Sequence, residues 1–169
     1  RALTPLYEAV ADSLRNGAPA GARVVDLGCG NGALLPVLRG WHAGYLGVDI
    51  SSEAVARFRG AGLLSGEDAR TMSAEEFRDF SGFDAAVFNE VLYYLPVAAA
   101  VGAVKAAASG LRPPGVVVVV MTENPKTGRI WEALDEWGAP IERRVFRPIA
   151  HEPPCELRRY GGASGIPTV

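Results

Sequence analysis

The stretch Val24-Val-Asp-Leu-Gly-Cys-Gly-Asn-Gly-Ala33 decides how this chain folds. Its first half continues an apolar strand that begins at Arg23, and its second half is a glycine-rich turn leading into a helix through Leu34 and Leu38. Because glycine has no Cβ atom, the backbone of such a turn can adopt positive φ angles and approach a ligand closely. In open sheets of parallel strands, ligands bind at a switch point beside turns of this kind. The sequence therefore predicts a ligand site at the carboxyl end of this strand.

Strand and helix patterns alternate from residue 22 to residue 137. The expected strands are residues 23–27, 45–49, 63–66, 83–88, 116–122, 141–147 and 156–160. A proline-rich loop, too short for a crossover helix, separates the last two, so we expect an antiparallel hairpin at one sheet edge. The pattern predicts a Rossmann-like, doubly wound α/β fold with a mostly parallel seven-stranded sheet. We expect one domain over residues 1–160, opened by a helix, and a flexible tail over residues 161–169.

The composition narrows the class of protein. The 169 residues are 49% apolar and 21% charged with a formal net charge of −2, which gives no general attraction to nucleic acid or to a membrane. The longest apolar run, Val116 to Met121, is far shorter than the roughly 20 residues of a transmembrane helix. Cys29 and Cys155 are far apart in sequence, and the histidines lack metal-ligand spacing. We therefore expect no metal site and a cytoplasmic location, and the oligomeric state stays open.

The glycine turn fits two kinds of ligand site. Gly28-x-Gly30-x-x-Ala33 satisfies the dinucleotide pattern G-x-G-x-x-G/A, so an NAD(P)-dependent oxidoreductase is one hypothesis. However, Asp26 lies two residues before Gly28, where its carboxylate could accept hydrogen bonds from the ammonium of an amino acid and would repel a pyrophosphate. Asp49 ends the next expected strand and could bind ribose hydroxyls in either kind of site. The position of Asp26 therefore favours a ligand with an amino-acid end.

The pattern Asp26-x-Gly28-x-Gly30-x-Gly32, followed by Asp49, resembles the first motifs of class I S-adenosylmethionine-dependent methyltransferases. The resemblance covers about residues 4–160 and implies S-adenosylmethionine as cofactor, with in-line transfer of its methyl group to an oxygen or nitrogen atom. It implies these cofactor-binding residues: Asp26, Gly28, Gly30 and Asn31 for the methionine end, Asp49 for the ribose, Asp68 and Ala69 in the third-strand loop for the adenine, and Asn89 near the sulfonium. Cys29, Ile50 and Glu90 are further expected cofactor-binding residues. For Cys29 we expect only backbone contacts.

The acceptor side is expected at the end of the fourth strand, in Phe88-Asn-Glu-Val-Leu-Tyr-Tyr-Leu95. Within it, Glu90-Val-Leu-Tyr-Tyr-Leu95 resembles small-molecule N-methyltransferases of the nodulation type, and Tyr93 and Tyr94 are candidates for contact with the acceptor. The alternative is that these aromatic side chains belong to the core. The candidate bases are Glu90, Glu123 after the fifth strand and His151 after the sixth, with a solvated loop as the alternative for His151. His42 precedes the second strand and is expected at the opposite edge of the sheet.

Three functions therefore remain as hypotheses. The first is a methyltransferase acting on a small molecule, because Asn89-Glu-Val-Leu92 differs from the Asn/Asp-Pro-Pro-aromatic run of enzymes that methylate nucleic-acid bases. The second is the nicotinamide-dependent oxidoreductase, although no Tyr-x-x-x-Lys dyad occurs in the chain. The third is a non-catalytic scaffold protein that binds S-adenosylmethionine, because the sequence shows no long N-terminal cap or inserted lid over the acceptor. The acceptor itself cannot be identified from the sequence.

Overall fold

The computed structural model describes residues 4–162. The strands are β1 (Arg23–Leu27), β2 (Gly44–Asp49), β3 (Glu67–Thr71), β4 (Ala85–Asn89), β5 (Val116–Thr122), β6 (Glu142–Phe146) and β7 (Cys155–Gly161). The helices are α1 (Thr4–Gly17), α2 (Leu35–Leu38), α3 (Ser52–Gly60), α4 (Val97–Gly110) and α5 (Thr127–Trp137), with a short 3-10 turn, η1 (Leu92–Tyr94).

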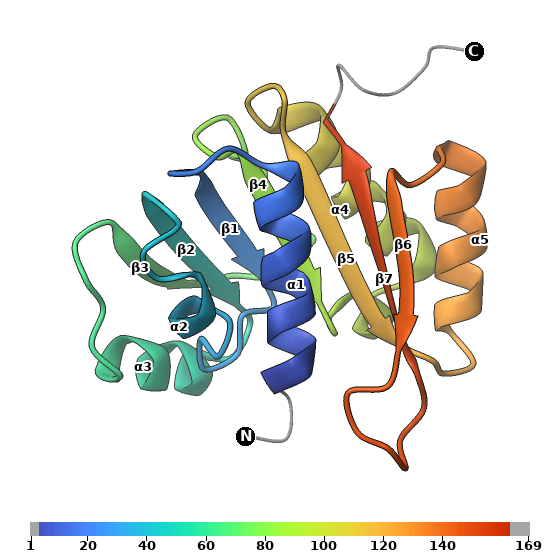
Figure 1. Cartoon of the computed structure of the whole chain (residues 1–169), viewed down its shortest axis with the longest axis horizontal. Coiled ribbons are helices and arrows are strands. Elements are labelled where there is room, and N and C mark those ends of the chain that lie inside the picture. Colours follow the sequence, from blue (N-terminus) through green and yellow to red (C-terminus); the bar gives the residue numbers. More distant parts are fainter. Residues whose placement is uncertain (1–3, 163–169) are drawn as a thin grey trace.

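All seven strands form one sheet in the order β3-β2-β1-β4-β5-β7-β6 (Figure 1). β1 to β5 are parallel, whereas β7 runs antiparallel to both of its neighbours, β5 and β6. The predicted doubly wound sheet with an antiparallel hairpin at one edge is therefore confirmed. The carboxyl ends of the parallel strands lie at the bottom of Figure 1, together with the loop that joins β6 to β7.

Helices cover both faces of the sheet. α1, α2 and α3 pack on one face, and α4 and α5 pack on the other (Figure 1). β5 contributes to both cores because side chains alternate between the two faces of a strand. Its side chains at 116, 118 and 120 join the first core, and those at 117, 119 and 121 join the second. A strand buried on both faces must be apolar throughout, which is why β5 could be predicted without error.

The third strand was predicted at the wrong place. The apolar residues around Leu63 belong to a bend between two glycines with positive φ angles, Gly62 (88°) and Gly66 (86°). β3 begins after this bend, and of its five residues only Ala69 is buried. An edge strand that is covered on little of its surface carries a polar sequence, so hydrophobic periodicity does not reveal it.

The chain end was also predicted slightly short. Gly161 pairs with Val116 in the β5–β7 ladder, and the Gly162 N–H donates a hydrogen bond to the Gly115 carbonyl oxygen at 2.6 Å. The first residues of the predicted flexible tail are thus part of the sheet, and residues 163–169 lie outside the described residues. Between residues 4 and 162, no helix has the length and apolar character that a membrane crossing requires.

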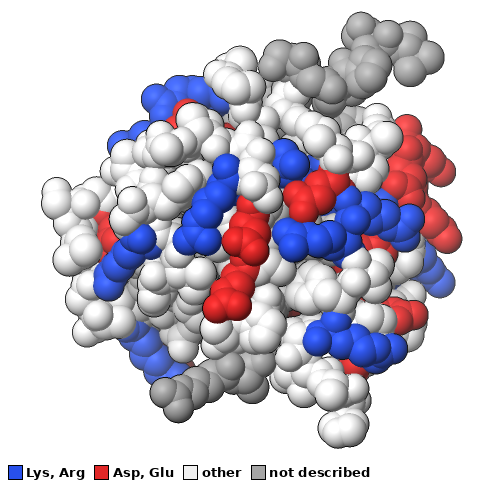
Figure 2. Space-filling model, in the orientation of Figure 1, with Lys and Arg blue, Asp and Glu red and all other residues white. Residues whose placement is uncertain are grey.

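A charged cluster fixes α1 to the β6–β7 hairpin. The carboxylate of Glu142 accepts hydrogen bonds from the Ser13 hydroxyl (2.7 Å) and from Arg159 Nε (3.0 Å). Its other oxygen lies 2.9 Å from Arg144 Nε. Figure 2 shows basic and acidic side chains interleaved over the face that carries α1 and the hairpin. Glu142 therefore joins three separate elements of the fold.

We predict that replacing Glu142 by alanine lowers the free energy of unfolding by about 1–3 kcal/mol, because the largely buried Arg159 loses its carboxylate partner. Urea denaturation measures the change. Glu132, which is exposed on α5, is the matched control, and its replacement by alanine should change the free energy by less than about 0.5 kcal/mol. Equal losses in the two variants would contradict this account of how α1 is anchored.

Candidate active site

The glycine turn between β1 and α2 has the backbone geometry that its sequence predicts. Gly28, Gly30 and Gly32 have φ angles of 83°, 54° and 80°. The N–H groups of Gly28 and Cys29 donate hydrogen bonds to the carbonyl oxygen of Val48 at 2.7 and 3.1 Å. The turn is thereby held across the carboxyl ends of β1 and β2, at the switch point of the sheet.

Two of these glycines serve different purposes. A Cβ atom at Gly28 would lie 2.5 Å from the Cβ atom of Val91, so the segment that follows β4 packs directly on the turn. A Cβ atom at Gly30 would meet no other atom of residues 4–162 within 4 Å, and Gly30 lines a cavity. Gly28 is therefore required for packing inside the protein, whereas Gly30 leaves room for a ligand.

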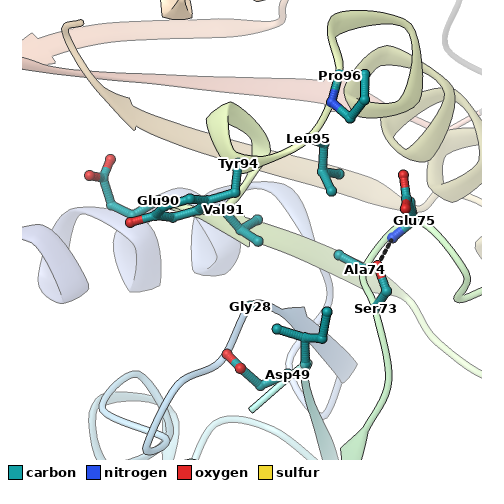
Figure 3. A pocket seen from close by; sticks show the side chains of 11 residues that line it. Gly28, Asp49, Ser73, Ala74, Glu75, Glu90, Val91, Tyr94, Leu95 and Pro96 are labelled. Atoms are coloured by element: carbon teal, nitrogen blue, oxygen red, sulfur yellow. Dashed lines mark hydrogen bonds between the residues drawn. The ribbon is translucent and has the colours of Figure 1, made fainter.

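A cavity of about 530 Å³ opens on one side of the turn (Figure 3). Its apolar lining consists of Ile50, Ala74, Val91, Tyr94, Leu95 and Pro96. Its polar lining consists of Asp49, Ser73, Glu75 and Glu90. Figure 3 shows Ser73, Ala74 and Glu75 on one side and the Asp49 carboxylate at the lower rim. A volume of this size suits a small molecule or a nucleoside.

A second cavity, of about 320 Å³, adjoins the first, and Gly28 and Glu90 line both. The glycine turn and β1 contribute Asp26, Cys29, Gly30 and Asn31. The ends of β4 and β5 contribute Asn89 and Thr122. The remaining wall consists of Leu6 and Tyr7 from α1, Pro148 and Glu152 from the β6–β7 loop, and Cys155 at the start of β7. The predicted ligand site at the end of β1 is thus a double cavity.

Asp26 is the most deeply buried carboxylate of this site, with 2% of its surface exposed. Its Oδ2 atom accepts a short hydrogen bond from the Tyr45 hydroxyl, and its Oδ1 atom has no hydrogen-bond partner within residues 4–162. Burial raises the pKa of Asp26 to about 7, although the Tyr45 hydrogen bond acts in the opposite direction, and the charge of Asp49 raises it further. A buried carboxylate with one free oxygen fits a ligand that brings a cation, such as the ammonium of a methionine moiety.

Asp49 lies at the end of β2, between the turn and the larger cavity. Its Oδ2 accepts a hydrogen bond from the Gly30 N–H (2.9 Å), and its Oδ1 accepts one from the Ser51 N–H (2.8 Å). These two bonds fix the plane of the carboxylate and leave lone pairs for the hydroxyls of a ribose. Ile50 is 76% exposed beside it and lines the same cavity. Both residues could hold the nucleoside part of a cofactor.

Glu90 has a backbone conformation that is rare for a residue with a side chain, with a φ angle of 57°. Its Oε1 accepts a hydrogen bond from the Thr122 N–H (2.5 Å), and its Oε2 accepts hydrogen bonds from the hydroxyls of Thr122 (2.7 Å) and Tyr93 (2.9 Å). A left-handed conformation costs about 1–2 kcal/mol, and these three bonds offset that cost. They hold the carboxylate at the junction of the two cavities.

Most of the sequence-predicted residues come together around this double cavity. Those that line it are Asp26, Gly28, Cys29, Gly30, Asn31, Asp49, Ile50, Asn89, Glu90 and Tyr94. The Oδ1 atom of Asn89 is buried and has no hydrogen-bond partner in the described part of the chain. It is therefore a second polar atom that a ligand could satisfy.

Asp68 and Ala69 do not belong to this group. Both lie inside β3, rather than in the loop after it, because the strand begins four residues later than predicted. Asp68 Oδ1 lies 3.4 Å from Arg59 Nη2, Asp68 Oδ2 lies 3.6 Å from Arg70 Nε, and Ala69 is fully buried. The loop that does follow β3 brings Ser73, Ala74 and Glu75 to the cavity wall. The placement of Asp68 and Ala69 in the loop after the third strand was therefore wrong, and neither residue lines a cavity of the site.

The two tyrosines after β4 have different surroundings. Tyr93 packs against the core beneath α4 and α5, and burial together with the nearby Glu90 raises its pKa. Tyr93 lines neither cavity of the site. Tyr94 is 76% exposed and lines the larger cavity. The core alternative thus describes Tyr93, and contact with an acceptor remains open for Tyr94.

The other candidate bases lie apart from Glu90. His151 is exposed in the β6–β7 loop and lines neither cavity of the site. Glu123 lines a separate cavity of about 330 Å³ between α5 and the hairpin. His42 Nε2 lies 3.4 Å from Glu67 Oε1, at the amino ends of the strands, as expected. Among residues 4–162, no group of three or more His, Cys, Asp or Glu side chains could hold a metal ion.

Sequence reasoning missed several residues of the site. Tyr45 was missed because the sequence does not reveal which residues of β1 and β2 lie diagonally opposite. Tyr7 and Glu152 reach the cavity from elements far away in the chain. Thr122 could have been found, because it ends β5 beside the predicted site. Ser73 would have followed from a correct placement of β3.

We predict different stability losses for alanine at the two glycines. Gly28→Ala combines an unfavourable φ angle with a steric clash against Val91, so the free energy of unfolding should fall by about 2–5 kcal/mol. Gly30→Ala meets no such clash and should lose only about 1–2 kcal/mol. Urea denaturation of both variants tests the contrast, and a loss for Gly30→Ala as large as that for Gly28→Ala would contradict it.

The pKa of Asp26 predicts a pH-dependent stability of the ligand-free protein. Between the unfolded value of 3.8 and the folded value of about 7, the folded protein holds a proton that the unfolded chain has lost. The stability that the neutral Asp26 carboxyl contributes is therefore lost as pH rises through this range. Asp26→Asn should be more stable than the native protein at about pH 8, and by a larger margin than at about pH 5. Urea denaturation at both pH values tests this, and an equal margin would contradict it.

The chain also matches known proteins. Residues 3–152 match a family model described as a methyltransferase domain. The ubiquinone biosynthesis O-methyltransferase of Aromatoleum aromaticum is 31% identical over 163 residues, which are 91% of this chain and 68% of that protein. The protein of the same name from Xanthomonas axonopodis pv. citri is 37% identical over 101 residues, which are 57% of this chain. The latter match spans 41% of the Xanthomonas protein, less than half of its length.

A solved structure shows the same fold. The N-methyltransferase NodS from Bradyrhizobium japonicum WM9, in complex with S-adenosyl-L-homocysteine, superposes with a TM-score of 0.75 and 22% sequence identity. The superposition covers 94% of this chain and 87% of that one. Because the family model spans most of the sequence, we conclude that this chain belongs to the methyltransferase-domain family, whose methyl donor is S-adenosylmethionine.

Proposed function

We propose that this chain binds S-adenosylmethionine across the double cavity and transfers its methyl group to an oxygen or nitrogen atom of a small molecule. The observation that carries the proposal is Asp26, whose buried and unpartnered Oδ1 lies beside a glycine turn. A cationic amino-acid end meets its charge, whereas the pyrophosphate of NAD would be repelled. The charge of Asp26 therefore favours a methyltransferase over a nicotinamide-dependent oxidoreductase.

Each part of the cofactor has candidate partners in this proposal. Asp26, the backbone of Gly28 to Asn31 and Asn89 bind the methionine end. Asp49 and Ile50 bind the ribose, and the loop of Ser73 to Glu75 takes the adenine position for which Asp68 and Ala69 were first considered. The cavity linings support these roles.

The bound cofactor supplies a methyl group that is already activated by its sulfonium. The residues of this chain then have mainly to hold the two reactants in line, and good alignment can lower a barrier by about 7–11 kcal/mol. An acceptor hydroxyl or amine must also lose a proton, for which a base contributes about 10²- to 10⁴-fold. Glu90 is a better candidate for this base than Glu123 or His151, because it lines both cavities.

The charges around the site indicate which acceptors fit. Five carboxylates line the two cavities: Asp26, Asp49, Glu75, Glu90 and Glu152. Among the described residues, no Lys, Arg or His lines either cavity. A carboxylate or phosphate on the acceptor would meet no opposite charge, so we propose an acceptor that is neutral or cationic. The names of the curated relatives support an oxygen atom as the site of methylation.

A cytoplasmic location is part of the same proposal. Cys29 and Cys155 are both buried free thiols. Buried free thiols are typical of proteins from a reducing compartment.

The proposal predicts that S-adenosylhomocysteine and S-adenosylmethionine stabilise the protein, whereas NAD and NADP do not. A ligand at about 100 times its dissociation constant adds about 2.7 kcal/mol, which raises the melting temperature of a chain of this size by about 5–10 °C. Asp49→Ala should abolish most of this shift. Asp68→Ala is the matched control, because Asp68 is an acid on the neighbouring strand that lines neither cavity, and it should keep the shift.

Turnover is measured with catechol acceptors that differ in charge, such as a neutral alkylcatechol, a catecholamine and a catechol carboxylic acid. Methylation of the neutral or cationic member in preference to the acid supports the proposal. A melting shift with NAD alone would favour the oxidoreductase, and cofactor binding without turnover on a broad acceptor panel would favour the non-catalytic scaffold. Preference for the acid would overturn the proposed acceptor class.

A further inference from the structure

Tyr45 is a buried residue, and the one polar atom of its side chain, the hydroxyl oxygen, contacts a residue of the candidate site. It lies on β2 with 2% of its surface exposed, and its ring packs edge-on against Phe58 at a centroid distance of 6.0 Å. In the parallel ladder, Asp26 pairs with Gly47, so the Tyr45 side chain crosses diagonally from β2 to reach the carboxylate on β1. Its hydroxyl donates a hydrogen bond to Asp26 Oδ2.

This bond divides the Asp26 carboxylate into two different oxygens. One oxygen is bound by the protein itself, whereas the other is buried without a hydrogen-bond partner in residues 4–162, and Asp26 as a residue lines the smaller cavity. Because the Tyr45 ring is fixed by its packing, the bond also fixes the plane of the carboxylate. Oδ1 is therefore held in one orientation before any ligand arrives.

The other ionisable groups around Asp26 do not stabilise its charge. They come from every neighbouring element: Tyr7 on α1, Cys29 in the turn, Asp49 at the end of β2, Glu90 after β4, and Glu152 and Cys155 from the hairpin. Each of these groups is neutral when it is protonated and negative when it is ionised, so none of them brings a positive charge. Among the described residues that line the cavity, none is basic. The Tyr45 hydroxyl is thus the donor on which an ionised Asp26 depends.

We propose that Tyr45 is a positioning residue for the cofactor: its hydroxyl favours the ionised Asp26 and aims Oδ1 at the ammonium group of S-adenosylmethionine. This inference rests on the proposed function and adds to it a residue that lines neither cavity. It also implies that cofactor binding is coupled to a proton. At any pH at which Asp26 is protonated in the free protein, this proton must be released to the solvent when the ammonium group binds.

The direction of this coupling follows from the pKa of Asp26, which burial raises to about 7. At about pH 6 most molecules hold the proton, so binding should release close to one proton and be weaker. At about pH 8.5 Asp26 is already ionised, so few protons should be released and binding should be tighter. Without the Tyr45 hydroxyl, the pKa of Asp26 should rise further. The pH range over which the affinity for the cofactor increases should then shift to higher values.

The test compares two ligands on Tyr45→Phe by titration calorimetry. S-adenosylhomocysteine carries the amino-acid end, whereas 5′-methylthioadenosine keeps the adenosine and the sulfur but lacks that end. At about pH 6 we expect the variant to bind S-adenosylhomocysteine about tenfold to a hundredfold more weakly than the native protein, since a hydrogen bond to a charged group is lost. We expect 5′-methylthioadenosine to bind both proteins within about twofold, and the loss for S-adenosylhomocysteine to shrink as pH rises.

Tyr160→Phe is the matched control, because Tyr160 is a buried tyrosine on β7 in the opposite core and should leave both affinities unchanged. Equal weakening of both ligands in Tyr45→Phe, or no weakening of S-adenosylhomocysteine, would overturn the inference. If Tyr45→Phe does not fold, calorimetry of the native protein in two buffers of different ionisation enthalpy decides. Binding without proton release at about pH 6 would then overturn it. If the native protein does not bind S-adenosylhomocysteine, this result would overturn the proposed function and therefore also the inference that rests on it.

Discussion

A carboxylate that is almost entirely buried is the constraint on which this site depends. Asp26 is the penultimate residue of β1, where the strand order reverses, and it lines a cavity with residues of α1 and pairs with Gly47 of β2. A charge in such a place needs donors or a cation, because its hydration has been removed. The protein supplies one donor, Tyr45, and leaves the other oxygen without a partner among residues 4–162, in a residue that lines a cavity. Because one oxygen of this carboxylate has no partner in the described protein, the site favours a positively charged ligand.

Glu90 is a second point at which local structure and function meet. Its strained backbone turns the chain from β4 towards η1, and its carboxylate ties that turn to Thr122 at the end of β5. Val91, the next residue, packs on Gly28. The glycine turn, the end of β4 and the end of β5 are thus connected through two neighbouring residues. A displacement of any one of them would reach the wall shared by both cavities.

The sequence was most informative where a residue type has a single structural use. The glycines of the turn after β1 and the apolar run from Val116 to Met121 each predicted one backbone arrangement, and the fold class followed from them. The turn alone fitted two kinds of ligand, and the position of Asp26 favoured one of them. The sequence failed where exposure masks the pattern, as in β3, whose polar residues misplaced Asp68. It also failed where chemistry depends on contacts between strands. Tyr45 reads as an ordinary core tyrosine, and only the register between β1 and β2 reveals its partner.

The order of the strands has a consequence for the making of this protein. β7 is the last strand to be synthesised, yet it lies between β5 and β6 and not at the edge of the sheet. β6 therefore leaves the ribosome before the strand with which it pairs, and one side of β5 stays open until residues 155–161 arrive. Pro148 and Glu152, which line the smaller cavity, lie in the loop that joins these two strands. A nascent chain should thus acquire its complete ligand pocket only after residues 155–161 have left the ribosome, although its glycine turn emerged much earlier.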